Sequence, residues 1–171
     1  IGASLARMEH ASAESHLRRA LQLSPGMVKA NLELGRLFTV LKRKYDAIEA
    51  YQAALKQDPD NVSARPLLAK QLQGVKRYDE AMAVVARAIE IEPENAAALK
   101  RYALLLSQSE KHDAAIAHAK KACDVAAKDP DAAFTLGLVL SAAGRNKDAI
   151  DAFNDALSRD PSWAKADKDQ K

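Results

Sequence analysis

The stretch 136-LGLVLSAAGRNKDAIDAFNDALSRDP-161 decides the fold, because its pattern recurs along the chain at intervals of 34 residues. Small residues mark each copy most clearly. Alanine fills two positions of every copy, which form the columns Ala13, Ala47, Ala81, Ala115, Ala149 and Ala20, Ala54, Ala88, Ala122, Ala156. A fixed period of this length predicts a fold built from repeated supersecondary units.

Each copy has the apolar spacing of two amphipathic helices. In residues 28–61, Leu34, Phe38 and Leu41 fall on one helical face at i, i+4 and i+7. After the polar break at residues 42–44, the apolar spacing resumes with Ile48, Tyr51 and Leu55. The composition agrees, since alanine, the best helix former, accounts for 36 of 171 residues.

The small residues and prolines have a physical role in such a helix pair. Two helices approach closely only where no side chain intervenes, so we expect Gly35 to face Ala47 and Tyr51. Pro59 ends the second helix because it lacks an N–H and disfavours helix at the preceding residue. Asp60 or Asn61 is then placed to cap the next helix.

With these columns the sequence resembles the tetratricopeptide repeat family over about residues 1–161. The resemblance implies an all-α fold, a right-handed superhelical solenoid of antiparallel helix pairs. Its repeats are expected at 28–61, 62–95, 96–129 and 130–163. Residues 1–27 match only the later part of a repeat, and we expect a short first helix there that ends near Arg7 or Met8. Residues 164–171 are expected to be a polar cap or a truncated repeat.

Two positions depart from the repeat pattern. Pro66 lies early in a first helix, which is harmless if Ser63 is the N-cap, because no N–H is needed in the first turn. In the fourth repeat Ala127 replaces the stopping proline, so we expect a longer second helix. Asp129-Pro130 is then interpreted as an N-cap followed by the first helical residue.

Composition and motifs exclude several functional classes. The net charge is only +3, which is weak support for nucleic-acid binding. No apolar run reaches the roughly 18–20 residues of a membrane-spanning helix, so we expect no membrane insertion of this segment. No nucleophile elbow, phosphate-binding loop or paired carboxylates occur. The sequence therefore predicts a protein that is not an enzyme and has no catalytic residue, metal or cofactor.

Histidine and cysteine are interpreted as structural residues. His10 and His16 are six apart, as are His112 and His118, and that spacing turns the two rings of each pair to different faces of a helix. Cys123 occupies an otherwise apolar column and is expected to be a buried apolar substitute.

The family resemblance implies that the first helices line a groove that holds the ligand. The residues between the buried positions of those helices are Lys29, Leu32, Arg36, Lys70, Lys100, Arg101, Leu104, Phe134 and Leu138. They combine a basic stripe with apolar positions, a surface that suits a peptide with acidic residues or a free carboxylate. Only Arg101 matches the carboxylate clamp of the chaperone-tail binders, so that ligand is not expected.

The sequence thus favours a non-enzymatic protein–protein interaction scaffold that binds a peptide or partner segment in the groove. Two alternatives stay open: an assembly solenoid of a larger machine, similar to that of bacterial polysaccharide-secretion proteins, and a regulatory region of an enzyme. Cytoplasm and bacterial periplasm are both compatible with the sequence. Because the end repeats are incomplete, we also expect self-association through the chain ends.

Overall fold

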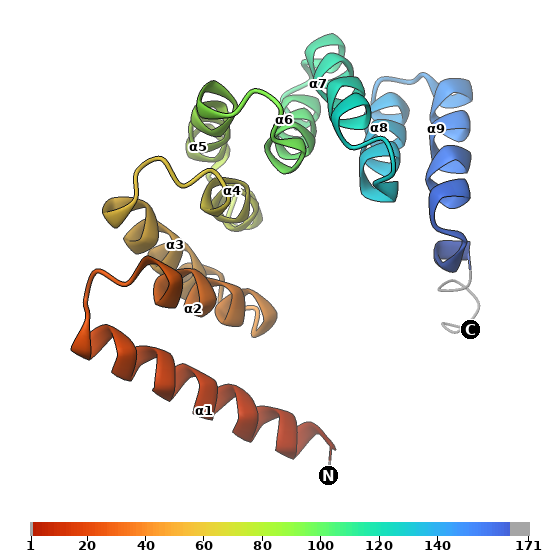
Figure 1. Cartoon of the computed structure of the whole chain (residues 1–171). Helices are drawn as coiled ribbons and strands as arrows, with labels where there is room; N and C mark the ends of the chain where they lie inside the picture. Colours follow the sequence, from red (N-terminus) through yellow and green to blue (C-terminus); the bar gives the residue numbers. More distant parts are fainter. Residues whose placement is uncertain (1, 165–171) are drawn as a thin grey trace. The chain divides into compact units, whose positions relative to one another are not determined.

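The computed structural model describes the backbone of residues 2–164 and the side chains of residues 8–162. That part of the chain contains no strand (Figure 1). Its helices are α1 (Gly2–Leu23), α2 (Val28–Val40), α3 (Lys44–Gln57), α4 (Ala64–Gly74), α5 (Tyr78–Ile91), α6 (Ala96–Gln108), α7 (His112–Val125), α8 (Pro130–Ala142), α9 (Asn146–Arg159) and the 3₁₀ turn η1 (Pro161–Ala164). The predicted all-α fold of antiparallel helix pairs is confirmed.

The helix pairs share one kind of tight turn. The second helices begin at Lys44, Tyr78, His112 and Asn146, which are 34 residues apart. Each turn contains one left-handed residue, with φ between 57° and 74°, at the equivalent positions Lys42, Lys76, Glu110 and Gly144. In the first of these turns, the Arg43 N–H donates to the Phe38 carbonyl at 2.9 Å, the long-range bond of a Schellman-type helix end.

The chain divides into two compact units between Val84 and Val85, within α5. In the first unit α3 packs against α2 and α4. Gly35 faces the ring of Tyr51, as predicted: a Cβ at this glycine would lie 2.6 Å from Tyr51 Cδ1. Ala47 and Ala54 are fully buried, so the small-residue columns mark close helix contacts here.

The second unit repeats this packing. α7 contacts α6 and α8, and α8 contacts α6 and α9. Gly137 lies against the ring of Phe153, where a Cβ would come within 2.5 Å of Cδ1. Ala115 and Ala122 are fully buried, and Ala149 and Ala156 nearly so.

Asparagine and aspartate cap three of the first helices. The Asn61 side chain accepts from the Ala64 N–H at 3.0 Å, and Asn95 accepts from Ala98 at 2.9 Å. Asp129 accepts from the Asp131 N–H at 2.9 Å and precedes Pro130, which confirms the predicted cap. Ser63 holds the N-cap position of α4, so Pro66 lies in the first turn as predicted, but the Ser63 side chain makes no capping bond. Asn61 performs that role.

Two expectations about helix length were wrong. α1 is a single helix from Gly2 to Leu23, with no break near Met8. Met8 occupies the column of the left-handed turn residues, and as a helix former it continues the helix instead. α7 has 14 residues, like α3, α5 and α9, because it ends at Val125 before Ala127 is reached.

None of the described helices is both long and apolar enough to cross a membrane. Of the predicted polar cap or truncated repeat at 164–171, Ala164 ends η1, and residues 165–171 lie outside the described residues.

Candidate functional site

In the first unit, the predicted groove residues lie on the outer surface of α2 and α4. Lys29, Arg36 and Lys70 are exposed, and Leu32 is half-buried. Arg36 pairs with Glu33 on the same helix, with 3.3 Å between guanidinium and carboxylate. Lys29 and Lys70 form no ion pair with a described residue, so they supply the uncompensated positive charge of this face.

A polar network beneath this face joins three helices. The hydroxyl of Thr39 on α2 donates to the Gly35 carbonyl at 2.8 Å and lies 3.4 Å from the Tyr51 hydroxyl of α3. Gln71 of α4, which is buried, donates to Thr39 at 3.1 Å. Thr39 lies one helical turn after Arg36, and Gln71 directly follows Lys70. The network therefore links the part of α2 that carries Arg36 to the part of α4 that carries Lys70. Sequence reasoning missed this network, because Gln71 occupies a column that is otherwise apolar.

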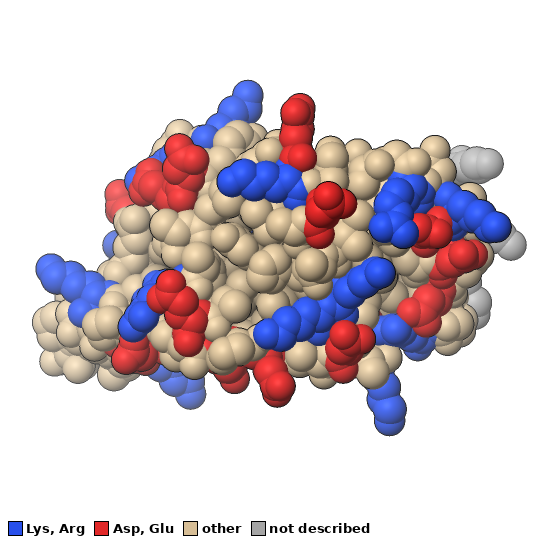
Figure 2. Space-filling view, turned by 90° about the horizontal axis from the view of Figure 1, so that it is seen from above, with Lys and Arg blue, Asp and Glu red and all other residues tan. Residues whose placement is uncertain are grey.

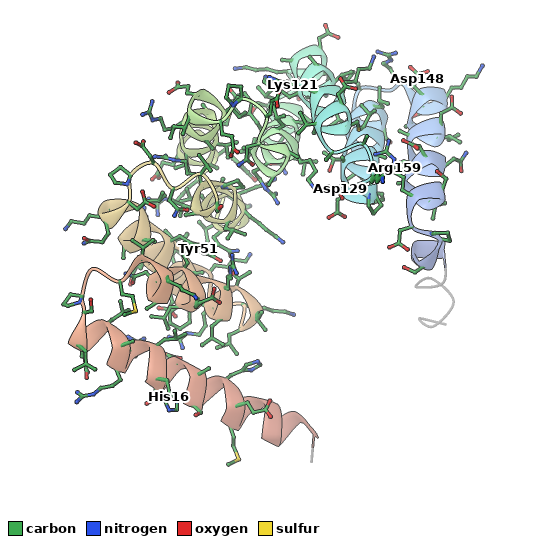
Figure 3. All side chains as sticks on the ribbon, in the orientation of Figure 1. His16, Tyr51, Lys121, Asp129, Asp148 and Arg159 are labelled. Atoms are coloured by element: carbon green, nitrogen blue, oxygen red, sulfur yellow. The ribbon has the colours of Figure 1, made fainter. Side chains whose placement is uncertain are left out.

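Arg36 and Glu33 of α2 lie close enough to the phenol of Tyr51, which is labelled in Figure 3, to affect its pKa. Burial raises the pKa of Tyr51, while the bond to Thr39 and the nearby Arg36 act in the opposite direction. The tyrosine is therefore neutral at physiological pH.

In the second unit, the basic residues of α6 are much less available than expected. The Lys100 side chain is only 20% exposed and pairs with Asp129 at 2.6 Å and with Asp131 at 3.9 Å. Arg101 is half-buried, and burial lowers the pKa of its guanidinium. The expected basic stripe therefore does not extend over α6 as exposed charge.

Asp129 explains why Lys100 is held in place. It caps α8, and its carbonyl also accepts from Arg159 at the end of α9 at 3.2 Å (Figure 3). Lys100 therefore acts as a link between α6 and the start of α8. A capping role for Asp129 was readable from the sequence, but its pairing with a lysine 29 residues away was not.

The apolar groove residues of this unit lie on one surface. Phe134 and Leu138, one turn apart on α8, are 38% and 40% exposed. Leu104 is half-buried on α6, which packs against α8. Phe134 is anchored by Phe153, with 5.4 Å between the ring centroids. The two units thus present different chemistry, basic and polar in the first and apolar in the second.

The remaining charges are dispersed. Basic and acidic side chains are interspersed over the face shown in Figure 2. Several pair along their own helix, as Arg87 does with Glu90 at 3.0 Å. Among the described residues, no group of three or more His, Cys, Asp or Glu side chains is close enough to hold a metal ion.

The histidines and the cysteine sit in different surroundings from one another. His118 is half-buried with its ring edge-on to Tyr102 at 5.0 Å, whereas His16 is exposed on α1. Cys123 is half-buried and not fully buried as expected, and burial raises the pKa of its thiol. A thiol held protonated in this way is a poor nucleophile.

Several solved structures share this fold. MamA is 22% identical, with 94% of each chain covered and a TM-score of 0.76. PilW, a type IV pilus biogenesis factor, is 23% identical over 91% of this chain and 72% of its own, with a TM-score of 0.80. YrrB, a repeat protein with an unusual peptide-binding site, is 18% identical over 91% of this chain and 80% of its own, with a TM-score of 0.69.

Sequence comparison agrees with the structural similarity. No curated protein matches the sequence at a significant level. One profile of the tetratricopeptide repeat family matches residues 5–70 and again residues 45–104, and a second profile of that family matches residues 109–171. The chain therefore belongs to the tetratricopeptide repeat family.

Proposed function

We propose that this chain is a non-enzymatic scaffold. It holds a peptide or partner segment on the exposed face of the first helices of its helix pairs, such as α8. The observation that carries the proposal is the pair Phe134 and Leu138 on α8 beside Leu104 on α6. Large apolar side chains exposed together on one surface mark an interaction site more often than a random surface does. The peptide-binding site of YrrB, a protein of the same fold, supports such a use.

The charges of the first unit suggest the character of the partner. Lys29 and Lys70 are exposed and unpaired within the described chain, and the Arg36 pair with Glu33 is solvent-exposed and weak. We infer that the α8 surface of the second unit favours a segment with bulky apolar side chains, and that the α2 and α4 surface of the first unit separately favours a segment with carboxylates. Lys100 contributes little, because Asp129 already neutralises it.

The test is an NMR titration with a blocked peptide that carries two leucines and two glutamates. We expect saturable shifts at Leu104, Phe134 and Leu138. Replacing both Phe134 and Leu138 by alanine should weaken binding at least tenfold, which equals about 1.4 kcal/mol. Val125→Ala, at a similarly exposed apolar residue of α7, is the matched control and should bind normally. Unchanged binding by the double variant would disprove the proposed site.

The charge component has its own test. In the first unit, Lys29→Glu with Lys70→Glu should weaken binding of a blocked glutamate-rich peptide and reduce the salt dependence of its affinity. Lys56→Glu, on the exposed face of α3, should leave both unchanged. If the Lys56 variant behaves like the double variant, the attraction is a general effect of net charge, and the partner need not meet α2 and α4.

A second function, assembly with another copy, is favoured by the exposed face of α9. Ile150 is 59% exposed, whereas Ile48 and Ile116, at the equivalent positions of α3 and α7, are 3% and 6% exposed. In those two cases the first helix of the next pair covers the second helix: α4 packs on α3, and α8 packs on α7. At the other end, Ala13 is exposed although its equivalents Ala47 and Ala115 are fully buried.

Sedimentation over a range of concentrations tests the assembly proposal. We expect association that Ile150→Lys abolishes, because a charge at that position blocks an apolar contact. Val40→Lys is the matched control, since Val40 is 66% exposed and lies on α2. A strictly monomeric wild-type chain, or equal effects of both substitutions, would rule out association through α9.

A further inference from the structure

The structure contains two repeat-equivalent grooves that lie away from the peptide surface proposed above. One, of about 440 Å³, lies between α7 and α9 with α8 as its floor. The other, of about 210 Å³, lies between α1 and α3 with α2 as its floor. Their lining residues correspond at a distance of three repeats, as in Leu34 and Leu136, Glu49 and Asp151, and Ala50 and Ala152.

A single column explains why grooves open at these places. Ala50 of α3 and Ala152 of α9 line the two grooves at equivalent positions of the walls. The equivalent residue on α7 is His118, whose ring packs edge-on against Tyr102 at 5.0 Å and fills the corresponding space. An alanine at this position therefore leaves room that a larger side chain occupies elsewhere in the same protein.

The first-unit groove shows which chemistry such a floor accepts. There the guanidinium of Arg43 lies 4.4 Å from the ring centroid of Phe38. The same group reaches Glu14 of α1 at 2.9 Å and Asp46 of α3 at 2.5 Å. An arginine thus lies on the apolar floor and joins the two walls, and this groove is the smaller of the two.

The α7–α9 groove lacks that bridge. Ile116 stands at the position equivalent to Glu14, and among the described residues Arg145 pairs only with Asp148, at 2.5 Å. Asp155, further along the same wall, is paired with Arg159 at 2.6 Å. Asp151, between them, and Lys120, on the opposite wall, form no ion pair with a described residue. An apolar floor is left between one free carboxylate and one free ammonium group.

We propose that the α7–α9 groove docks a helical partner segment that carries an arginine and a carboxylate one turn apart beside a leucine. The arginine lies on Leu136, Leu140 and Ala152 and meets Asp151, while the carboxylate meets Lys120. Arginine is preferred to lysine because its planar group lies flat on an apolar surface and binds a carboxylate through two N–H groups. Arg43 on Phe38 is the same arrangement within this chain.

The test uses a blocked, alanine-based helical peptide with Glu, Leu and Arg at i, i+3 and i+4, titrated into the isotope-labelled chain. We expect saturable shifts at Leu136, Leu140 and Asp151. Replacing the peptide arginine by citrulline, which keeps the shape and removes the charge, should weaken binding at least tenfold. No saturable shift at about 1 mM peptide, the weakest affinity of interest, would overturn the proposal.

Protein variants locate the site. Asp151→Lys and Ala152→His, which reproduces the filling by His118, should each weaken binding at least tenfold. Asp151 is exposed, so its variant stays informative if the histidine perturbs the fold. Glu49→Lys is the matched control, because the equivalent groove is already bridged by Arg43. Normal binding by Asp151→Lys would overturn the proposal.

One further variant separates this inference from the function proposed above. The double substitution of Phe134 and Leu138 by alanine should leave binding of the arginine peptide intact. If it abolishes that binding, the peptide occupies the α8 surface, and the groove inference is wrong while the proposed scaffold function is supported.

Discussion

Gly137 shows how one hydrogen atom sets a helix–helix distance. The ring of Phe153 occupies the space where a Cβ would project, and Tyr51 does the same at Gly35. Each aromatic ring therefore packs directly on the backbone of the partner helix. In both pairs the glycine lies on the first helix, and the aromatic residue lies on the second helix, nine positions after the left-handed turn residue Lys42 or Gly144.

We predict that Gly137→Ala destabilises the chain by about 1–3 kcal/mol, because the methyl group overpacks against Phe153. In a Phe153→Ala background the same change should cost little. Gly74→Ala is the control, since a Cβ there would meet only the flexible side chain of Lys44 at 3.3 Å. Urea unfolding of the four variants measures the effect, and equal stabilities of the Gly137 and Gly74 variants would contradict it.

His118 makes stability depend on pH. Burial against Tyr102, and then the nearby Lys121, lower the pKa of its imidazole. The folded state thus binds this proton less readily than the unfolded chain, where histidine titrates near about 6.5. The contribution of His118 is present above that pH and is lost as the pH falls through the folded-state pKa.

We therefore expect the melting temperature to fall between pH 7.5 and pH 5.5, and to fall less in His118→Gln. The exposed His16, whose ring bonds to the Ser12 carbonyl at 2.7 Å, provides the control. His16→Gln should keep the wild-type pH dependence. Thermal melting by circular dichroism at both pH values measures the effect. An equal fall in melting temperature in the wild type, His118→Gln and His16→Gln would refute the role of His118.

At the scale of the element, the turns differ in how well their residues suit the backbone. All four hairpin turns need a left-handed residue, yet only Gly144 is a glycine. Lys42, Lys76 and Glu110 adopt the same conformation with a side chain, which costs about 1–2 kcal/mol each. The helix packing that follows each turn offsets this cost.

This difference predicts opposite effects of exchanging residues in the turn. Gly144→Ala should destabilise by about 1–2 kcal/mol, although nothing within 4 Å would contact the new methyl group. Lys42→Gly should stabilise by about 0.5–1 kcal/mol, since the penalty is removed and chain entropy takes back part of the gain. Chemical denaturation checks both, and a loss of stability in Lys42→Gly would contradict the turn geometry.

The helices themselves were predictable because their periodicity is local. Gly35 against Tyr51 and the Asp129 cap follow from residue type and spacing. The continuous α1 did not, since the repeat pattern implies a turn that Met8 does not form. Within the candidate site, exposed Phe134 and Leu138 were predictable from the column, but the neutralised Lys100 was not. Its partner comes from another helix, and periodicity carries no information on such pairs.

On the scale of the whole molecule, stability is distributed unequally among the helices. α3, α7 and α8 pack on both sides, whereas α1 packs on α2 and leaves Ala13 exposed. A helix with fewer buried contacts opens at a lower free energy than the rest. The backbone amides of α1 are thus expected to exchange with solvent through local opening, and those of α3, α7 and α8 through opening of a larger part of the chain.

Amide hydrogen exchange should show this gradient. We predict weaker protection of the amides in α1 than of those at equivalent positions in α3 and α7, by at least tenfold in exchange rate. Ala13, Ala47 and Ala115 form a matched set, because they differ in exposure and share residue type and column. Uniform protection across the three would indicate that the chain opens only as a whole.

The short connections between successive helices also affect how fast the chain folds. The extensive helix contacts described above join neighbours or next neighbours along the chain, such as α6 with α8. Proteins rich in such short-range contacts fold rapidly, since no long loop has to close before the first pair is stabilised. Each hairpin of this chain is therefore able to form as soon as it has left the ribosome, while the residues that follow are still being added.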